Sequence, residues 1–109
     1  MWNPDLLKDR RVLVTAGADG IGLRIASAFH AAGARVLVCD VQQAALDRLA
    51  DTRPGLLGVR ADVAAEDDVA ELFRAVDRQL VGLDVLVNNA GVAGPTGGTE
   101  TLSLADWER

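Results

Sequence analysis

The chain has 109 residues, half of them hydrophobic, and a formal net charge of -5 at pH 7, so it can form one domain with its own core. An acidic chain with only four aromatic residues lacks the clustered cations and stacking side chains of a nucleic-acid surface. No apolar run approaches the roughly 18 residues of a membrane span, no hydrophobic leader follows Met1, and one cysteine permits no internal disulfide, which predicts a cytoplasmic protein.

The first predicted element is a buried strand, Val12–Thr15, that enters a glycine-rich turn containing Gly17. A helix is predicted over about Gly20–Ala32, with its apolar residues at helical spacing: Ile21, Ile25, Ala28, Phe29 and Ala32. The backbone N–H groups of such a strand, turn and helix converge on one point, where the helix dipole favours an anion. The pattern predicts a site for a dinucleotide pyrophosphate; the alternative is that the glycines only form a tight turn.

A second buried strand, Arg35–Cys39, ends at Asp40, which lies about 20 positions beyond the glycine turn. A carboxylate at that strand tip can accept hydrogen bonds from both hydroxyls of an adenine ribose. The alternative is a carboxylate that only ends the strand. A helix over about Gln42–Ala50 follows, and Cys39 is expected to be an inert, buried thiol.

The third strand is predicted at Leu56–Ala61 and leads into Asp62 and Val63. The side chain of Asp62 could also cap a turn before Ala64. The next helix has the clearest periodicity, with acidic residues 66–68 in its first turn and five apolar positions on one face: Val69, Leu72, Phe73, Val76 and Leu80. The acidic cluster is interpreted as a solvated helix start, and no metal site is predicted.

A fourth strand is predicted at Asp84–Asn88, where Asn88 is expected to tie the strand to its neighbours. Residues 93–99 have the composition of a flexible loop, and Ser103 is a candidate cap for a helix that begins at Leu104. That helix would run for barely two turns before Arg109, which is short for a stable helix. We therefore expect the chain to be the first part of a longer protein.

Short apolar runs alternate with amphipathic ones along the whole chain, which predicts an α/β fold with a parallel sheet between helices. In a Rossmann-type doubly wound sheet the four strands would lie in the order 3-2-1-4, truncated after the fourth strand. Residues 1–109 are predicted to form a single domain, the N-terminal portion of a larger one.

The chain resembles the N-terminal half of a short-chain dehydrogenase/reductase from Arg10 to Arg109. Residues 15–22 are similar to that family's Thr-Gly-x-x-x-Gly-x-Gly loop, and the spacing within 20–22 is similar to its shorter, single-domain branch. Residues 62–63 resemble the pair that caps the adenine ring, and residues 88–91 resemble the Asn-Asn-Ala-Gly signature. The resemblance implies an NAD(P)-dependent oxidoreductase that moves a hydride between nicotinamide and a small alcohol or carbonyl substrate. It also implies a homo-oligomer for the complete protein.

The resemblance implies a cofactor site made of the glycine turn, the acidic strand ends and the fourth-strand signature: Gly17, Asp19, Gly20, Ile21, Gly22, Asp40, Asp62, Val63, Asn89, Ala90 and Gly91. Asp40 at the ribose would repel a 2′-phosphate, and Val41 after it offers no compensating cation. Asp19 adds a second negative charge in the glycine loop. Both carboxylates predict NAD rather than NADP as the cofactor.

The chain departs from the family pattern in two places. Ala16 occupies the position of the first glycine of the loop, and Gly17 is expected to supply the backbone freedom instead. The family's catalytic Asn, Ser and Tyr-x-x-x-Lys lie C-terminal to the Asn-Asn-Ala-Gly signature, whereas this sequence has no tyrosine and its one lysine is Lys8. No catalytic residue is assigned, and the chain alone is predicted to be inactive. The alternatives are a non-catalytic dinucleotide-binding module and a truncated product that folds poorly.

Overall fold

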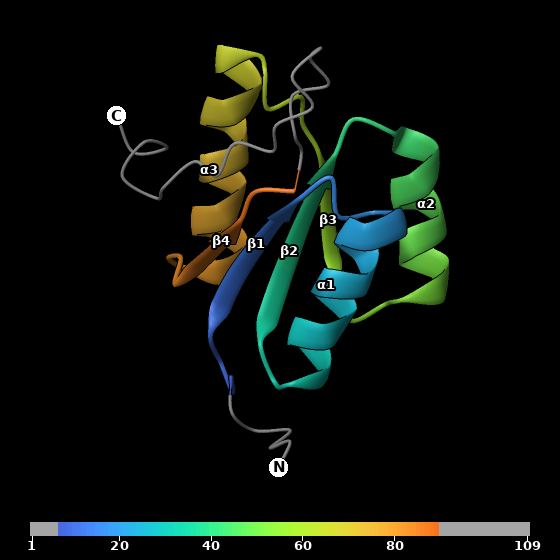
Figure 1. The fold of residues 1–109 in the computed structure, drawn as a ribbon. Coiled ribbons are helices and arrows are strands. Elements are labelled where there is room, and N and C mark those ends of the chain that lie inside the picture. The colour runs from blue at the N-terminus through green and yellow to red at the C-terminus, as the bar shows by residue number, and fades with distance from the viewer. Residues whose placement is uncertain (1–6, 90–109) are drawn as a thin grey trace, which may run out of the picture.

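The computed structural model describes residues 7–89, which form four parallel strands and three helices. The sheet order is β3-β2-β1-β4, as predicted (Figure 1). Ala90, Gly91, the loop at 93–99 and the helix expected from Leu104 lie outside the described residues. The elements in chain order are β1 (Arg11–Thr15), α1 (Gly20–Ala31), β2 (Arg35–Asp40), α2 (Gln43–Thr52), β3 (Leu57–Arg60), α3 (Glu66–Leu80) and β4 (Val85–Val87).

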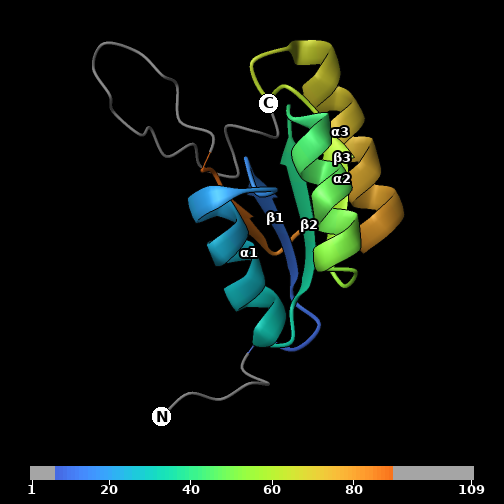
Figure 2. The same cartoon turned by 90° about the vertical axis from the view of Figure 1, so that its right-hand side faces the viewer.

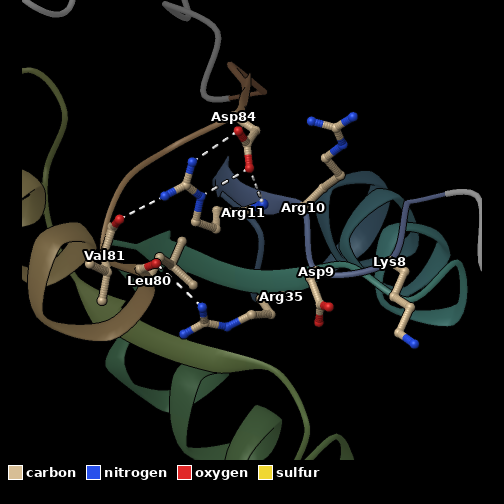
Figure 3. Close-up of a pocket in the computed structure, with 8 residues that line it drawn as sticks. All are labelled: Lys8, Asp9, Arg10, Arg11, Arg35, Leu80, Val81 and Asp84. Atoms are coloured by element: carbon tan, nitrogen blue, oxygen red, sulfur yellow. Dashed lines mark hydrogen bonds and ion pairs between the residues drawn. The ribbon is translucent and has the colours of Figure 1, made fainter.

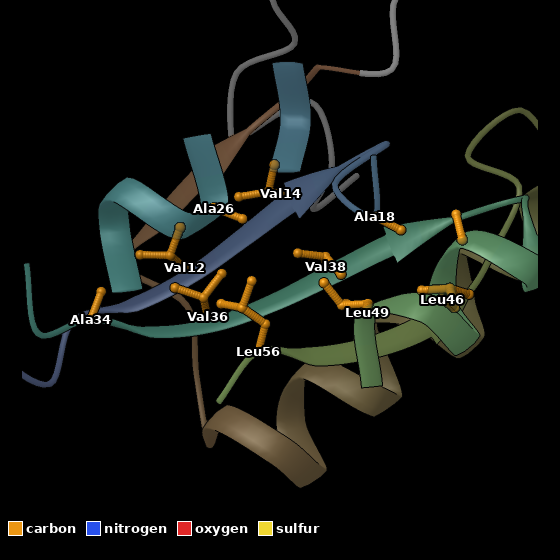
Figure 4. Packing of buried hydrophobic residues seen from close by; sticks show 11 residues of the cluster. Val12, Val14, Ala18, Ala26, Ala34, Val36, Val38, Leu46, Leu49 and Leu56 are labelled. Carbon is orange, nitrogen blue, oxygen red and sulfur yellow. The ribbon is translucent and has the colours of Figure 1, made fainter. Parts of the chain in front are cut away.

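Helices cover both faces of the sheet, and α1 and α3 stand on opposite sides of its strands in Figure 2. Helix α2 shares the face of α1, because residues of both helices belong to one core, whereas α3 contributes to the other. The two central strands, β1 and β2, are therefore almost continuously apolar, as strands buried on both faces are. Alternate side chains of these strands enter two separate cores. The core under α1 and α2 is drawn in Figure 4 and contains Val12, Val14, Val36 and Val38. The core under α3 contains Leu13, Leu37, Cys39, Leu72 and Val76.

Helix α1 packs on the sheet through fewer of its apolar residues than predicted. Ile25 and Phe29 contact the core, and Ala32 just beyond the helix is buried. Ile21 and Ala28 share the helical spacing but are exposed, with 69% of the Ile21 surface accessible. Ile21 belongs to the first turn, which follows directly on the glycine loop at the carboxyl end of β1.

At the opposite edge of the sheet, Arg11 fastens the start of β1 to the loop between α3 and β4 (Figure 3). Its guanidinium donates to both carboxylate oxygens of Asp84, with Nε–Oδ2 3.0 Å and Nη2–Oδ1 3.1 Å, and Nη1 donates to the carbonyl of Val81 at 2.7 Å. The Arg11 backbone N–H donates to Asp84 Oδ2 as well. The side-chain hydrogen bond from Arg11 is the main reason why the pKa of Asp84 lies well below its ordinary value of 3.8.

This arrangement predicts how acid destabilises the fold. Because the pKa of Asp84 is lower in the folded chain than in the unfolded chain, its stabilising effect is complete above pH 4 and is lost as pH falls further. Asp84→Asn should therefore flatten the loss of unfolding free energy between pH 5 and pH 2, measured by urea titration at several pH values. Asp47→Asn, on the exposed side of α2, is the matched control and should leave the slope unchanged. Equal slopes for Asp84→Asn and wild type would contradict the assignment.

Helix α3 ends on a residue whose backbone favours glycine. Val81 has φ 59° and ψ 43°, the left-handed region, and 73% of its surface is exposed. A β-branched side chain is strained there, and its removal uncovers no core. Val81→Gly is expected to raise the free energy of unfolding by about 1 kcal/mol, measured by chemical denaturation. Val41→Gly is the control, because Val41 is also exposed but has no positive φ, and it should give no gain.

Candidate functional site

The carboxyl ends of all four strands meet at one edge of the sheet, and backbone contacts join them there. The N–H of Gly17 donates to the carbonyl of Cys39 at 3.1 Å, and the N–H of Ala61 donates to the carbonyl of Asp40 at 3.1 Å. The N–H of Asn89 donates to Thr15 Oγ1 at 2.8 Å. The segments that follow β3, β2, β1 and β4 therefore lie along a single edge, which brings together the described part of the predicted site.

The glycine turn is built differently from the prediction. Ala16 itself adopts the left-handed conformation, with φ 50°, at a cost of roughly 1–2 kcal/mol for a residue with a Cβ. Gly17 has no positive φ; instead, a Cβ on it would lie 2.7 Å from Cβ and Cγ1 of Val38. The expectation that Gly17 supplies the missing backbone freedom is wrong. Glycine at this position allows the turn to approach β2 closely.

Gly22 is needed for a second close approach. A Cβ on Gly22 would overlap the carbonyl oxygen of Ala16 and lie 2.7 Å from Nδ2 of Asn89. The Nδ2 group of Asn89 also donates to the Ala16 carbonyl at 3.3 Å. The start of α1, the turn before it and the residue after β4 are therefore packed against one another with no room for a side chain.

The first turn of α1 presents backbone N–H groups that have no acceptor inside the helix. Asp19 caps the helix, and its Oδ1 accepts the N–H of Gly20 at 2.8 Å. Within residues 7–89, no acceptor takes the N–H groups of Ile21 and Gly22. The sequence indicated only the charge of Asp19; the structure adds its role as the helix cap. Two amides at the positive end of the helix dipole remain for an anion.

Asp40 is placed beside this turn by two backbone hydrogen bonds. Its Oδ2 accepts the N–H of Ala18 at 3.2 Å, and its Oδ1 accepts the N–H of Gln42 at 3.1 Å. The residue is 8% exposed, and it forms no ion pair with any residue of the described part. Each carboxylate oxygen has two lone pairs, so each can accept a further hydrogen bond. The carboxylate is thus held in a fixed orientation next to the glycine turn with acceptor capacity left.

The side chain of Asp62 caps a turn before Ala64, the predicted alternative to a contact with a ligand. Its Oδ1 accepts the N–H of Ala64 at 2.9 Å, which is an Asx-turn, and its own N–H donates to Oδ2 of Asp68 at 2.9 Å. Val63 is half-buried and packs against the core under α3. The position of this pair at the end of β3 is as expected, and one oxygen of Asp62 is committed to the local fold.

Sequence reasoning missed the part played by Thr15. This residue is fully buried, and its Oγ1 lies 3.2 Å from Asn88 Oδ1 and 3.4 Å from the carbonyl of Val87 while it accepts the Asn89 N–H. The hydroxyl therefore joins the end of β1 to the end of β4. Asn88 is tied to the neighbouring strand through its side chain, as predicted. An apolar strand pattern ending in threonine gave no signal for this role.

Arg48 is a second residue that sequence reasoning did not single out. It lies on α2, and its Nη2 is 3.8 Å from Oδ2 of Asp19. Asp19 therefore connects the first amide of α1 to a cation on the neighbouring helix. Cys39, by contrast, fits its prediction: burial raises the pKa of the thiol to about 12, so it stays protonated and is not a nucleophile at neutral pH.

The fold and this edge agree with a known family. The family model described as short chain dehydrogenase matches residues 10–109. The chain belongs to the short-chain dehydrogenase family. Its members are oxidoreductases that bind a nicotinamide dinucleotide.

Relatives of this short-chain dehydrogenase chain include enzymes of named activity. It is 40% identical over 104 residues to the 3-beta-hydroxysteroid dehydrogenase of Comamonas testosteroni, which covers 94% of this chain and 41% of that protein. It is 44% identical over 90 residues to an uncharacterized oxidoreductase of Mycobacterium bovis, covering 80% of this chain and 36% of that protein. The chain thus spans about two fifths of the length of these curated relatives.

Solved structures give the same fold. A hydroxysteroid dehydrogenase from Escherichia coli matches with a TM-score of 0.74 at 29% identity, over 88% of this chain and 43% of that one. A 3-ketoacyl-(acyl-carrier-protein) reductase from Brucella melitensis, solved in complex with NADH, matches with a TM-score of 0.73 at 33% identity. That match covers 79% of this chain and 36% of the reductase. Among residues 7–89 of this short-chain dehydrogenase chain, no helix has the length and apolar character to cross a membrane.

Proposed function

We propose that this chain binds NAD, in preference to NADP, as the cofactor-binding half of an oxidoreductase. The observation that carries the proposal is the hydrogen bond from the Ala18 N–H to Asp40 Oδ2. It holds a ribose-binding carboxylate beside the unaccepted amides of Ile21 and Gly22, which suit a diphosphate. A nicotinamide dinucleotide needs these two groups side by side, so the described residues fit the cofactor.

Each part of the site has a role in this proposal. The amides in the first turn of α1 bind the pyrophosphate, with Gly17 and Gly22 allowing the close approach of the backbone. Asp40 accepts the hydroxyls of the adenine ribose, while Asp62 and Val63 flank the adenine. The exposed apolar side chains of Ile21 and Val41 lie in this region and would lose contact with water on binding. Asn89, Ala90 and Gly91 are assigned to the ribose and nicotinamide side.

The bound nicotinamide would supply a hydride acceptor or donor for an alcohol or carbonyl carbon of a small molecule. In the proposal, the residues of this chain bind and orient the cofactor, and none of them is assigned a proton-transfer step. The 109 residues alone are therefore proposed to bind NAD without turnover, and the complete protein is proposed to act as a cytoplasmic homo-oligomer. Dehydrogenase activity of the isolated chain with simple secondary alcohols would contradict this assignment of roles.

Cofactor preference provides the direct test. Wild type is expected to bind NAD at least tenfold more tightly than NADP, measured by isothermal titration calorimetry, because the Asp40 carboxylate favours ribose hydroxyls and repels a 2′-phosphate. Asp40→Ala should weaken NAD binding about tenfold and reduce the difference between the affinities for NAD and NADP. Asp47→Ala removes an exposed carboxylate from α2 and should change neither affinity. Tighter binding of NADP than NAD by wild type would refute the proposal.

A further inference from the structure

Two carboxylates flank the place where the proposed ribose would lie. Asp40 is bonded to the N–H of Ala18, and Asp19 is the next residue along the chain. Asp40 is nearly buried, whereas three quarters of the Asp19 side-chain surface is exposed. A phosphate on the 2′ oxygen of that ribose would enter a region of two negative charges. The solvent-facing carboxylate of Asp19 is the one that a substitution can remove without disturbing the core.

The side chain of Arg48 forms an ion pair with Asp19. The Arg48 guanidinium projects from α2, with 64% of its side-chain surface exposed, and its Nη2 lies 3.8 Å from Asp19 Oδ2. The other oxygen of Asp19 accepts the Gly20 N–H. The carboxylate of Asp19 therefore accepts a hydrogen bond from the first amide of α1 and also pairs with Arg48. Since an exposed ion pair contributes little stability, Arg48 is free to change partner at small cost.

We propose that Arg48 is a further residue that sets the cofactor preference, in addition to Asp40: Asp19 holds Arg48 as its own counter-ion, and Arg48 becomes a ligand for a 2′-phosphate once the carboxylate at position 19 is gone. Arginine suits this role because its planar guanidinium binds phosphate oxygens in pairs. The inference rests on the proposed function, since it needs a ribose held at Asp40.

The test uses two ligands that differ only in the 2′-phosphate, 5′-AMP and adenosine 2′,5′-bisphosphate, titrated into the full chain by calorimetry. Asp19→Ser removes the charge and keeps a good helix cap, so the fold should be preserved. We expect the affinity for the bisphosphate, divided by the affinity for 5′-AMP, to be about tenfold higher in this variant than in wild type. The gain should shrink as salt is raised from 0.05 M to 0.5 M.

The double variant Asp19→Ser with Arg48→Ala decides the role of the arginine. The proposal requires the double variant to lose the gain in bisphosphate affinity. Arg53→Ala in the Asp19→Ser background is the matched control, because Arg53 lines the hollow of about 670 Å³ beside Asp19 and Gly20 but forms no ion pair with Asp19. This control should keep the gain.

Each other outcome overturns a defined claim. A gain that persists without Arg48 would show that repulsion by Asp19 acts alone and would overturn the proposal. No gain in Asp19→Ser would overturn it as well. If one of these two results is found while wild type still binds 5′-AMP and NAD, only the inference about Arg48 fails. If wild type binds neither, the proposed dinucleotide site fails first, and the inference fails with it.

Discussion

Gly22→Ala is expected to lower the free energy of unfolding by about 3 kcal/mol, the upper end of the usual range for overpacking. The added Cβ would overlap the Ala16 carbonyl oxygen and crowd Nδ2 of Asn89, and backbone on both sides of the contact would have to move. Because the amides of the first turn of α1 move with it, NAD binding should be lost even at temperatures where the variant is folded. Urea denaturation and calorimetric titration measure the two effects.

Gly20→Ala is the matched control for this prediction. Gly20 lies in the same turn with φ 57°, but a Cβ on it would meet no atom within 4 Å. Its cost should be only that of a left-handed alanine, about 1 kcal/mol. The difference between the two variants isolates the close approach from the backbone conformation. Equal losses in both would contradict the packing argument and leave conformation as the sole reason for glycine.

Thr15→Val should lower the free energy of unfolding by about 2 kcal/mol, although valine has nearly the same shape. The substitution removes the nearer of two acceptors of the Asn89 N–H, which also donates to the carbonyl of Val87 at 3.2 Å. It also removes the contact with the Asn88 side chain at the end of β4. The partly buried Asn89 N–H would then keep only its longer hydrogen bond, and the Asn88 side chain would lose one of its partners. Hydrogen exchange of the Asn89 amide should accelerate in this variant.

Thr15→Ser serves as the control for the hydroxyl. Serine keeps the oxygen and removes only the methyl group, so the slow exchange of the Asn89 amide should be retained. The stability of Thr15→Ser should fall by the cost of a buried methyl group, about 1 kcal/mol. If valine were tolerated as well as serine, the link from β1 to β4 through the hydroxyl would not matter for stability.

Much of the fold could be predicted because its signals are local. Apolar runs that enter glycine turns predicted four parallel strands, and the positions of the helices between them predicted the order β3-β2-β1-β4. The third and fourth strands are one residue shorter at each end than predicted. Their predicted end residues are Leu56 and Ala61, and Asp84 and Asn88. Two of them still bond to the neighbouring strand: the Ala61 N–H donates to the Asp40 carbonyl of β2, and the Asp84 N–H donates to the Arg11 carbonyl of β1.

What could not be predicted depends on contacts between distant segments. The sequence shows that position 17 is a glycine, but the reason for it is the close approach to Val38, which exists only when β2 is in place. In the sequence, Arg48 is one more charged residue on an exposed helix face. Only the packing of α2 beside α1 brings it to Asp19. Helical spacing groups Ile21 with the apolar residues of α1, yet Ile21 is exposed in the structure. That these residues bind a cofactor stays a prediction from the motif. The structure defines how those up to Asn89 are arranged.

The hydroxyl of Thr15 is bonded to the amide of Asn89, 74 positions later in the chain. A ribosome adds roughly 5–20 residues per second, so β1 waits several seconds after its own synthesis before its partner β4 exists. During that time the edge of β1 that pairs with β4 is uncovered, and the glycine turn lacks the asparagine that contacts it. The glycine turn can therefore take its final arrangement only after β4 has emerged from the ribosome.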